Sequence, residues 1–157
     1  MPIFYTYLST PIGTLTATCT DTALTGLSFE KTVPADAHYA PQHSILQQLD
    51  RQLHLYFDGK LRQFCLPLAP AGTDFQRRVW RQLCQIPYGQ TRTYGQLAAA
   101  VGNPRASRAV GGANHHNPIV IVIPCHRVVA QNGIGGYGGG VDKKRFLLQL
   151  EQHFFEN

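Results

Sequence analysis

The 157-residue sequence is poor in cysteine and has no Cys-x-x-Cys pair. Its four cysteines lie far apart in the chain: Cys19, Cys65, Cys84 and Cys125. A chain of this length can fold around an apolar core without a disulfide framework, so we expect free thiols. The histidines of the N-terminal part do not lie at zinc-ligand spacing from these cysteines, and no metal site is expected.

Long apolar segments are also lacking. No run approaches the roughly 18 residues of a membrane span, and the first ten residues, "MPIFYTYLST", have neither the charged region nor the apolar stretch of a secretory signal. A hydrophobic fraction of 43% still suffices for one good core or two small ones. The sequence therefore predicts a globular, soluble, cytoplasmic protein with no membrane partner.

Acidic residues are scarce in the second half of the chain. Residues 71–157 carry ten basic and four acidic groups, a net charge of +6, whereas residues 1–70 carry four basic and five acidic groups, a net charge of −1. This asymmetry indicates that the second half meets a polyanion. A basic face that is merely solvated would carry the same charge, so charge alone leaves both interpretations open.

The N-terminal part has the pattern of a small α/β domain over residues 1–66. The first thirty residues are rich in Thr, Tyr, Phe and Leu and are broken by turn residues, which predicts a meander of three strands. Apolar residues at helical spacing from Ile45 to Tyr56 predict a helix, and a short strand is expected at residues 62–68. Residues 67–72 contain two prolines and a glycine and are predicted to be a linker.

Residues 73–157 have the pattern of a mostly helical domain. Thr73 and Thr93 each precede a glutamine by three residues, as in the capping boxes that begin helices. A third helix is predicted to start with Asn103 as its N-cap and Pro104 in its first position. The second and third helices would then form a helix-turn-helix.

Two further features complete the expected core of this domain. The last helix should begin at Asp142 and place Phe146, Leu150 and Phe154 on one apolar face. Cys84, beside the apolar stripe of the first helix, is expected to lie in the core.

The third helix of this domain is made largely of small residues, among them Ala106, Ala109 and Gly111. Each of its two adjacent glycines weakens a helix by about 1 kcal/mol relative to alanine, so the close approach of a bulky partner must offset that loss. Arg105 and Arg108 indicate that the partner is anionic.

Cys125 stands beside a histidine at the end of the most apolar run of the chain, residues 119–123. Such a cysteine can be an inert core residue, a metal ligand or a nucleophile. Since an ordinary thiol has a pKa of about 8.5 and burial raises it, a nucleophile needs help from its neighbours. His126, Arg127 and Asn117 could stabilise a thiolate, with a carboxylate orienting the histidine. The residues alone leave nucleophile and inert core as alternatives.

A loop at residues 133–140 contains six glycines. Because glycine is conformationally permissive, this loop is ordered only if it makes contacts, and otherwise it is a flexible surface turn.

Four motifs in this order, "TYGQLA", "NPRASRAVGGANHHNP", "IPCHRV" and "GYGGG" followed by "KRFLLQLE", resemble those of the O6-alkylguanine-DNA alkyltransferases, also called methylated-DNA–protein-cysteine methyltransferases. The resemblance is close from Thr73 to Glu151 and loose in the N-terminal part, where it rests on "STPIGTL". It implies an α+β fold, with a ribonuclease-H-like N-terminal domain of antiparallel strands plus helix, followed by a winged helix-turn-helix-like C-terminal domain.

The resemblance also implies an activity. A monomer without cofactor would bind double-stranded DNA through the minor groove and transfer a methyl or other alkyl group from O6-alkylguanine irreversibly to Cys125, with O4-alkylthymine as a further candidate substrate. The product is a thioether that water cannot hydrolyse, so each molecule would act once. The target atom lies inside the duplex, and the base must therefore be flipped out.

The family assigns roles to matching positions. His126, through a bound water, and Glu151 form the relay that activates Cys125, Asn117 supports the thiolate, and Tyr94 acts at the flipped guanine and at a neighbouring phosphate.

Other positions correspond to residues that contact DNA or the base. Arg108 corresponds to the finger that fills the gap in the base stack. In the family, the helix that carries this residue lies in the minor groove, where small residues permit close approach. The positions that the family assigns to this contact with DNA are Arg105, Ala106, Ala109 and Gly111. The pocket for the base would be formed by Tyr137, Gly138, Val128 and Cys125.

Gly138 departs from the pattern, because some members have a serine there. Two alternatives remain. A non-catalytic module that only marks DNA lesions would lack the acceptor cysteine, which is present here as Cys125. A cysteine hydrolase with a Cys-His pair would have no need of a basic helix-turn-helix.

Overall fold

The computed structural model describes residues 1–156, and Asn157, the last residue of the expected C-terminal domain, lies outside the described residues. The chain divides into two compact units, one from Met1 to Ala71 and the other from Gly72 onward. In the described part of the chain, no helix is both long enough and apolar enough to cross a membrane.

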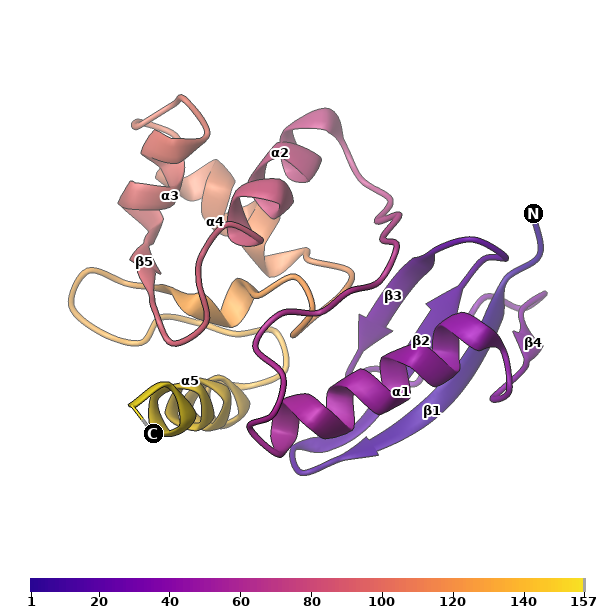
Figure 1. The fold of residues 1–157 in the computed structure, drawn as a ribbon. Helices are drawn as coiled ribbons and strands as arrows, with labels where there is room; N and C mark the ends of the chain where they lie inside the picture. The colour runs from indigo at the N-terminus through magenta and orange to yellow at the C-terminus, as the bar shows by residue number, and fades with distance from the viewer. Residues whose placement is uncertain (157) are drawn as a thin grey trace. The chain divides into compact units, whose positions relative to one another are not determined.

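The first unit contains a four-stranded sheet with the order β3-β2-β1-β4 (Figure 1). The strands are β1 (Phe4–Thr10), β2 (Gly13–Cys19), β3 (Leu24–Ser28) and β4 (His38–Tyr39). The first three pair antiparallel, which confirms the predicted meander, and β4 adds a short parallel pair to β1. Thr10 pairs with Gly13 at the turn between β1 and β2, where Gly13 has a φ of 116° that favours glycine.

The helix α1 (Ser44–Phe57) packs against β1 and β2 of this sheet. Its buried face is formed by Ile45, Leu46, Leu49, Leu53 and Tyr56, at the spacing that predicted the helix.

The strand expected at residues 62–68 is wrong, because only one isolated bridge, between Leu68 and Leu24, forms there. The Gln52 side chain on α1 occupies the N–H and the C=O of Cys65, each at 2.9 Å, so this backbone bonds to a side chain and not to a neighbouring strand.

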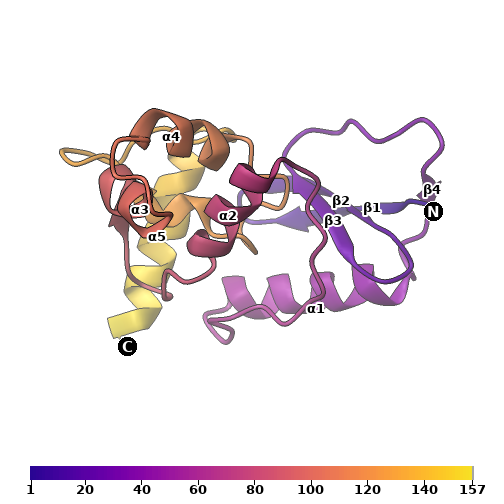
Figure 2. The same ribbon diagram turned by 90° about the horizontal axis from the view of Figure 1, so that it is seen from above.

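The second unit contains four α-helices, one short 3-10 helix and two short strands among its described residues. In chain order its elements are α2 (Asp74–Leu83), β5 (Arg92–Thr93), α3 (Tyr94–Ala100), α4 (Ser107–His115), the one-turn 3-10 helix η1 (Cys125–Arg127), β6 (Val128–Val129) and α5 (Val141–Glu156). Both capping boxes are present, at Thr73 and Thr93. The helices α3 and α4 pack against each other and against α2, in the expected helix-turn-helix arrangement (Figure 2).

The predicted start of α4 is wrong by three residues. The N–H of Ala106 donates to the C=O of Asn103 at 3.0 Å, which closes a turn with Pro104 in its second position. Proline favours that position of a β-turn as much as it favours the first turn of a helix, so the same residue pattern fits both structures.

Two core expectations for the second unit are also wrong. Cys84 is the C-cap of α2 and is exposed. On α5, Phe146 is 38% exposed, and the buried residues are Lys144, Leu147 and Glu151. The buried face of this helix therefore carries two charged side chains. Their burial is possible because both have partners in the site described below.

Candidate active site

Cys125 lies at the start of η1 and is only 4% exposed. The apolar run that precedes it, residues 119–123, is buried at Ile119, Ile121 and Ile123 and forms tight turns, not an extended strand. Ile121 has a φ of 70°, a left-handed conformation that is strained for a β-branched residue, at a cost on the order of 1–3 kcal/mol.

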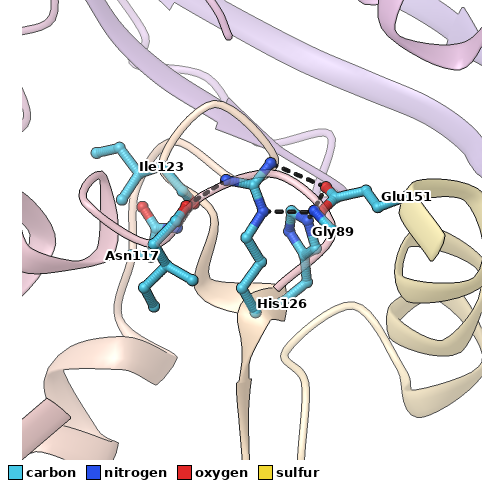
Figure 3. A network of polar contacts seen from close by, with 7 residues as sticks. Gly89, Asn117, Ile123, His126 and Glu151 are labelled. Atoms are coloured by element: carbon cyan, nitrogen blue, oxygen red, sulfur yellow. Dashed lines mark hydrogen bonds and ion pairs between the residues drawn. The ribbon is translucent and has the colours of Figure 1, made fainter. Parts of the chain in front are cut away.

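Asn117 bridges this turn from one side. Its Oδ1 accepts from the N–H of Ile119 at 3.0 Å, and its Nδ2 donates to the C=O of Ile123 at 2.7 Å (Figure 3). A second buried amide, Asn114 on α4, donates to the C=O of Cys125 at 3.4 Å. These two amides hold the cysteine backbone in place.

His126 and Glu151 form a buried pair across 25 positions of sequence. Nε2 of the histidine lies 2.6 Å from Oε2 of the carboxylate, and Glu151 extends from α5 toward His126 and Gly89 (Figure 3). We assign the imidazole proton to Nε2, because the carboxylate is an acceptor. Nδ1 is buried and has no hydrogen-bond partner among the described residues.

Arg127 is a second partner of Glu151, and the sequence did not predict this contact. Its Nε donates to Oε1 at 2.7 Å and its Nη2 to Oε2 at 3.1 Å, while Nη1 donates to the C=O of Ile86 at 2.7 Å. The N–H of Gly89 also donates to Oε1, at 3.3 Å. Arg127 therefore contacts the carboxylate, whereas the sequence suggested a direct role at the thiol.

Lys144 is a further buried charge that the sequence reasoning missed. Its Nζ donates to the C=O of Val128 at 2.6 Å and to the C=O of Gly136 at 3.1 Å, so it ties the segment after the cysteine to the glycine-rich loop. Burial lowers its pKa to about 8. The spacing of Lys144, Leu147 and Glu151 on one helical face is the signal that could have revealed it.

The protonation states follow from burial and neighbouring charge. Burial raises the pKa of the Cys125 thiol to about 11, although a hydrogen bond from Asn117 and the charge of Lys144 lower it in part. Burial also lowers the pKa of His126, against the opposing effect of Glu151. Burial alone would raise the pKa of Glu151, but the charges and hydrogen bonds of His126 and Arg127 outweigh it and hold that pKa well below its usual range.

At neutral pH the site therefore holds a thiol, a neutral imidazole, a carboxylate and a guanidinium. In this arrangement the neutral imidazole of His126 has a lone pair at Nδ1 that can accept a proton.

Tyr94 and the glycine-rich loop adjoin this group. The pairing of β5 with β6 places Tyr94, the first residue of α3, directly after the strand that lies beside Val128. A Cβ at Gly135 would come within 3.2 Å of the Tyr94 hydroxyl and 3.3 Å of Nζ of Lys144, and Gly135 has a φ of 77°. The loop therefore packs against side chains of the site and is not a free surface turn.

The remaining expected pocket residues lie in this loop and in β6. Burial raises the pKa of Tyr137, and the Cys125 charge adds to that effect. A Cβ at Gly138 would lie 3.8 Å from the ring of His115, which is ordinary van der Waals contact. Val128 is fully buried.

The expected DNA-binding residues lie apart from the buried hydrogen bonds, on and just before α4. Arg105, Arg108 and Ala109 are exposed, and Ala106 and Gly111 are half-buried. A Cβ at Gly111 would lie 3.9 Å from the Tyr94 ring, whereas a Cβ at the neighbouring Gly112 would meet no atom within 4 Å. No intramolecular contact in the described structure requires a glycine at position 112.

Comparison with known proteins places this chain in a class. Residues 74–153 match the model of the 6-O-methylguanine DNA methyltransferase, DNA binding domain, and residues 3–70 match that of its ribonuclease-like domain. Fold and matches together define the class of the two-domain 6-O-methylguanine DNA methyltransferases.

Individual relatives agree along nearly the whole chain. The methylated-DNA–protein-cysteine methyltransferase of Methanosarcina barkeri is 46% identical over 155 residues, which is 96% of this chain and 98% of the relative. That of Mycobacterium tuberculosis (strain H37Rv) is 47% identical over 153 residues, with coverages of 96% and 93%. The crystal structure of Mycobacterium tuberculosis OGT in complex with DNA superposes with a TM-score of 0.91 at 45% identity, covering 96% and 94% of the two chains. The chain belongs to the 6-O-methylguanine DNA methyltransferase family, which confirms the resemblance seen in its motifs.

Proposed function

We propose that this protein repairs double-stranded DNA by transferring a methyl or other alkyl group from O6-alkylguanine irreversibly to Cys125. The observation that carries this proposal is the buried Cys125 turn next to the His126–Glu151 pair, with Nδ1 of His126 available as a proton acceptor. O4-alkylthymine carries its alkyl group on a similar exocyclic oxygen and is a candidate second substrate.

The chemistry follows from these residue types. Sγ of Cys125 forms a bond to the alkyl carbon while the bond from that carbon to the guanine oxygen breaks. The thiol proton passes to His126 through a water, and Tyr94 supplies a proton to the departing base. Burial raises the pKa of Tyr94, which keeps its hydroxyl protonated at neutral pH. The imidazolium of His126 returns its proton through water to the Tyr94 phenolate, so in sum the base gains the proton that the thiol loses and the reaction requires no cofactor.

Recognition of DNA is assigned to α4 and the residues just before it. Arg108 fills the space that a flipped base leaves, and flipping costs a few kcal/mol that this contact partly offsets. Arg105, Ala106, Ala109 and Gly111 lie against the minor groove. The exposed arginines and the open space at Gly112 support this assignment.

The flipped base occupies a pocket between the cysteine turn and the glycine-rich loop. Tyr137 and Gly138 line it from the loop, and the main chains of Cys125 and Val128 hold the guanine edge. Lys144 supports this pocket by bonding to the carbonyls of Val128 and Gly136.

The protein acts as a monomer in the cytoplasm. All four cysteines are free, and an acceptor thiol must remain reduced until it reacts. We also propose that residues 67–72 are a linker between an N-terminal domain, residues 1–66, and a C-terminal domain, residues 73–157.

Intact mass spectrometry after incubation with duplex DNA containing O6-methylguanine tests the proposal. We expect a mass increase of one methyl group, mapped to the peptide that contains Cys125, and no increase in Cys125→Ser. Methylation at Cys19, Cys65 or Cys84, or repeated turnover with release of methanol, would contradict it.

A further inference from the structure

Arg127 is a buried cation at the site that the proposed chemistry does not use. It lies one residue beyond His126, is 7% exposed, and shares both oxygens of Glu151 with its neighbours. Its guanidinium carbon also lies 5.7 Å from the centre of the Tyr88 ring. A buried arginine with this many contacts needs an explanation, because burying a charge costs several kcal/mol unless it is paired.

The pairing of His126 with Glu151 creates a difficulty for proton transfer. A carboxylate close to an imidazole stabilises the protonated form and raises the histidine pKa. A histidine that is already protonated at neutral pH has no lone pair at Nδ1 and cannot accept the thiol proton. The carboxylate that orients His126 therefore opposes burial, which favours the neutral imidazole, and a cation that balances the carboxylate charge would favour the neutral form further.

We propose that Arg127 is a positioning residue that balances the charge of Glu151 and so keeps His126 neutral, with its acceptor lone pair at Nδ1. The two side chains bind the same carboxylate, the histidine at Oε2 and the arginine at both oxygens. The carboxylate can then orient the imidazole through a hydrogen bond while its negative charge is largely neutralised by the guanidinium. This inference rests on the proposed function, in which His126 accepts the proton.

The other charges around His126 agree with this assignment. Glu151 and Lys144 act on it from α5, and Arg127 and Cys125 lie beside it in η1. The helix α2 packs against η1; its buried residues Val79, Trp80 and Leu83 are not titratable, and its C-cap Cys84 is titratable and interacts electrostatically with Arg127. Burial lowers the pKa of His126, Glu151 raises it, and Arg127 and Lys144 lower it.

A matched pair of variants separates charge from geometry. Arg127→Lys keeps the positive charge and loses the two-pronged contact, whereas Arg127→Gln loses the charge and keeps a hydrogen-bond donor. The rate of Cys125 alkylation by free O6-benzylguanine, measured from about pH 5 to about pH 9 across the range in which histidine titrates, reports the protonation of His126 without DNA binding.

We expect the wild-type rate to be constant at neutral and alkaline pH and to fall only in acid. In Arg127→Gln this fall should move upward by about one pH unit, which makes the variant up to about tenfold slower on the acid side of the wild-type fall and nearly equal to wild type near pH 9. Arg127→Lys should keep a profile close to that of wild type. Arg145→Gln, which removes an exposed arginine of α5, is the control and should change nothing.

Several outcomes would overturn the inference. One is a pH–rate profile of Arg127→Gln that superimposes on that of wild type or moves toward acid. Another is a pH–rate profile of Arg127→Lys that is displaced as far as that of Arg127→Gln. If Arg127→Gln does not fold, the nitrogen chemical shifts of His126 in the wild-type protein decide, because an imidazolium at neutral pH contradicts the inference and a neutral Nε2–H form supports it. Failure of the proposed function gives a different result, an unalkylated Cys125 in the wild-type protein at every pH.

Discussion

Glu151 shows how much a single residue of this site depends on its surroundings. It is almost fully buried on α5 and binds His126, Arg127 and the backbone of Gly89. In sequence it is one more acidic residue of a helix, 26 positions from the cysteine. Its contacts indicate that it supports both the orientation of the imidazole and the burial of an arginine.

We expect Glu151→Gln to change the pH dependence of alkyl transfer. Without the carboxylate, His126 is a weaker base and Cys125 must ionise unaided. Because the pKa of that thiol is raised to about 11, the thiolate fraction at neutral pH is very small and increases about tenfold per pH unit. The variant should therefore be slow at neutral pH and recover steadily toward pH 11, whereas wild type should be flat above the histidine range.

The same variant should also lose stability, by about 3–5 kcal/mol, because it leaves Arg127 buried without its anion. Unfolding in urea measures this loss and shows the conditions under which rates can be compared. The double variant Glu151→Gln/Arg127→Gln removes both charges and should regain part of the stability without regaining the rate. Superimposable pH profiles of wild type and Glu151→Gln would remove Glu151 from the mechanism.

At the scale of a secondary-structure element, α4 combines poor helix formers with exposed cations. It lacks a side-chain N-cap and contains two adjacent glycines, so its helix is held by packing of Val110, Ala113 and Asn114. The N–H of the Trp80 indole on α2 donates to the C=O of Ala113 at 2.8 Å and adds a buried anchor. Arg108 and Gly112 lie one helical turn apart and thus on the same face.

Arg108→Ala should slow repair of duplex DNA far more than reaction with free O6-benzylguanine, because only the duplex requires a base to be flipped and replaced. Rates of Cys125 alkylation with the two substrates provide the comparison. Arg51→Ala, at an exposed position of the first unit, is the matched control. Equal losses with both substrates would assign Arg108 to the pocket and not to flipping.

Gly112 offers a second test of the same helix. Gly112→Ala should raise the free energy of unfolding by about 0.5–1 kcal/mol, because the helix gains a better former and the added methyl group meets no neighbour. Gly112→Leu should still fold but should weaken duplex binding, since a bulky side chain on that face keeps the backbone away from the groove. Unchanged duplex affinity in Gly112→Leu would show that this face does not approach DNA closely.

At the scale of the whole molecule, charge is distributed unevenly. The formal net charge of +5 results from an excess of basic groups in residues 71–157, which form α2 to α5. Contacts between these cations and phosphates release counterions, so duplex affinity should depend on salt while reaction with a neutral free base should not.

Duplex affinity measured at several salt concentrations should give a straight line of log affinity against log salt, with a slope that steepens by about 0.9 for each phosphate neutralised. Arg108→Ala should reduce the magnitude of this slope by at most about 0.9, the contribution of one phosphate contact. An affinity that does not change with salt would contradict electrostatic docking by this half of the chain.

The sequence by itself determined the elements that depend on short-range signals. The hairpin strands, the apolar spacing of α1 and the capping boxes at Thr73 and Thr93 were predicted correctly, because each is encoded by residues a few positions apart. The candidate residues and the family were found through short motifs. The same local reasoning failed at Asn103 and Pro104, where one pattern fits both a turn and a helix start.

Only the tertiary structure decided how the charges of the site are used. Arg127 and Lys144 were not predicted in their present roles, and the apolar face expected for α5 at Phe146 proved to be exposed. A buried lysine, arginine or glutamate is stable only when partners from distant segments satisfy it. Those partners, the carbonyls of Ile86, Val128 and Gly136 and the turn that holds His126, come together when α5 packs against η1, and no spacing within the sequence encodes that packing.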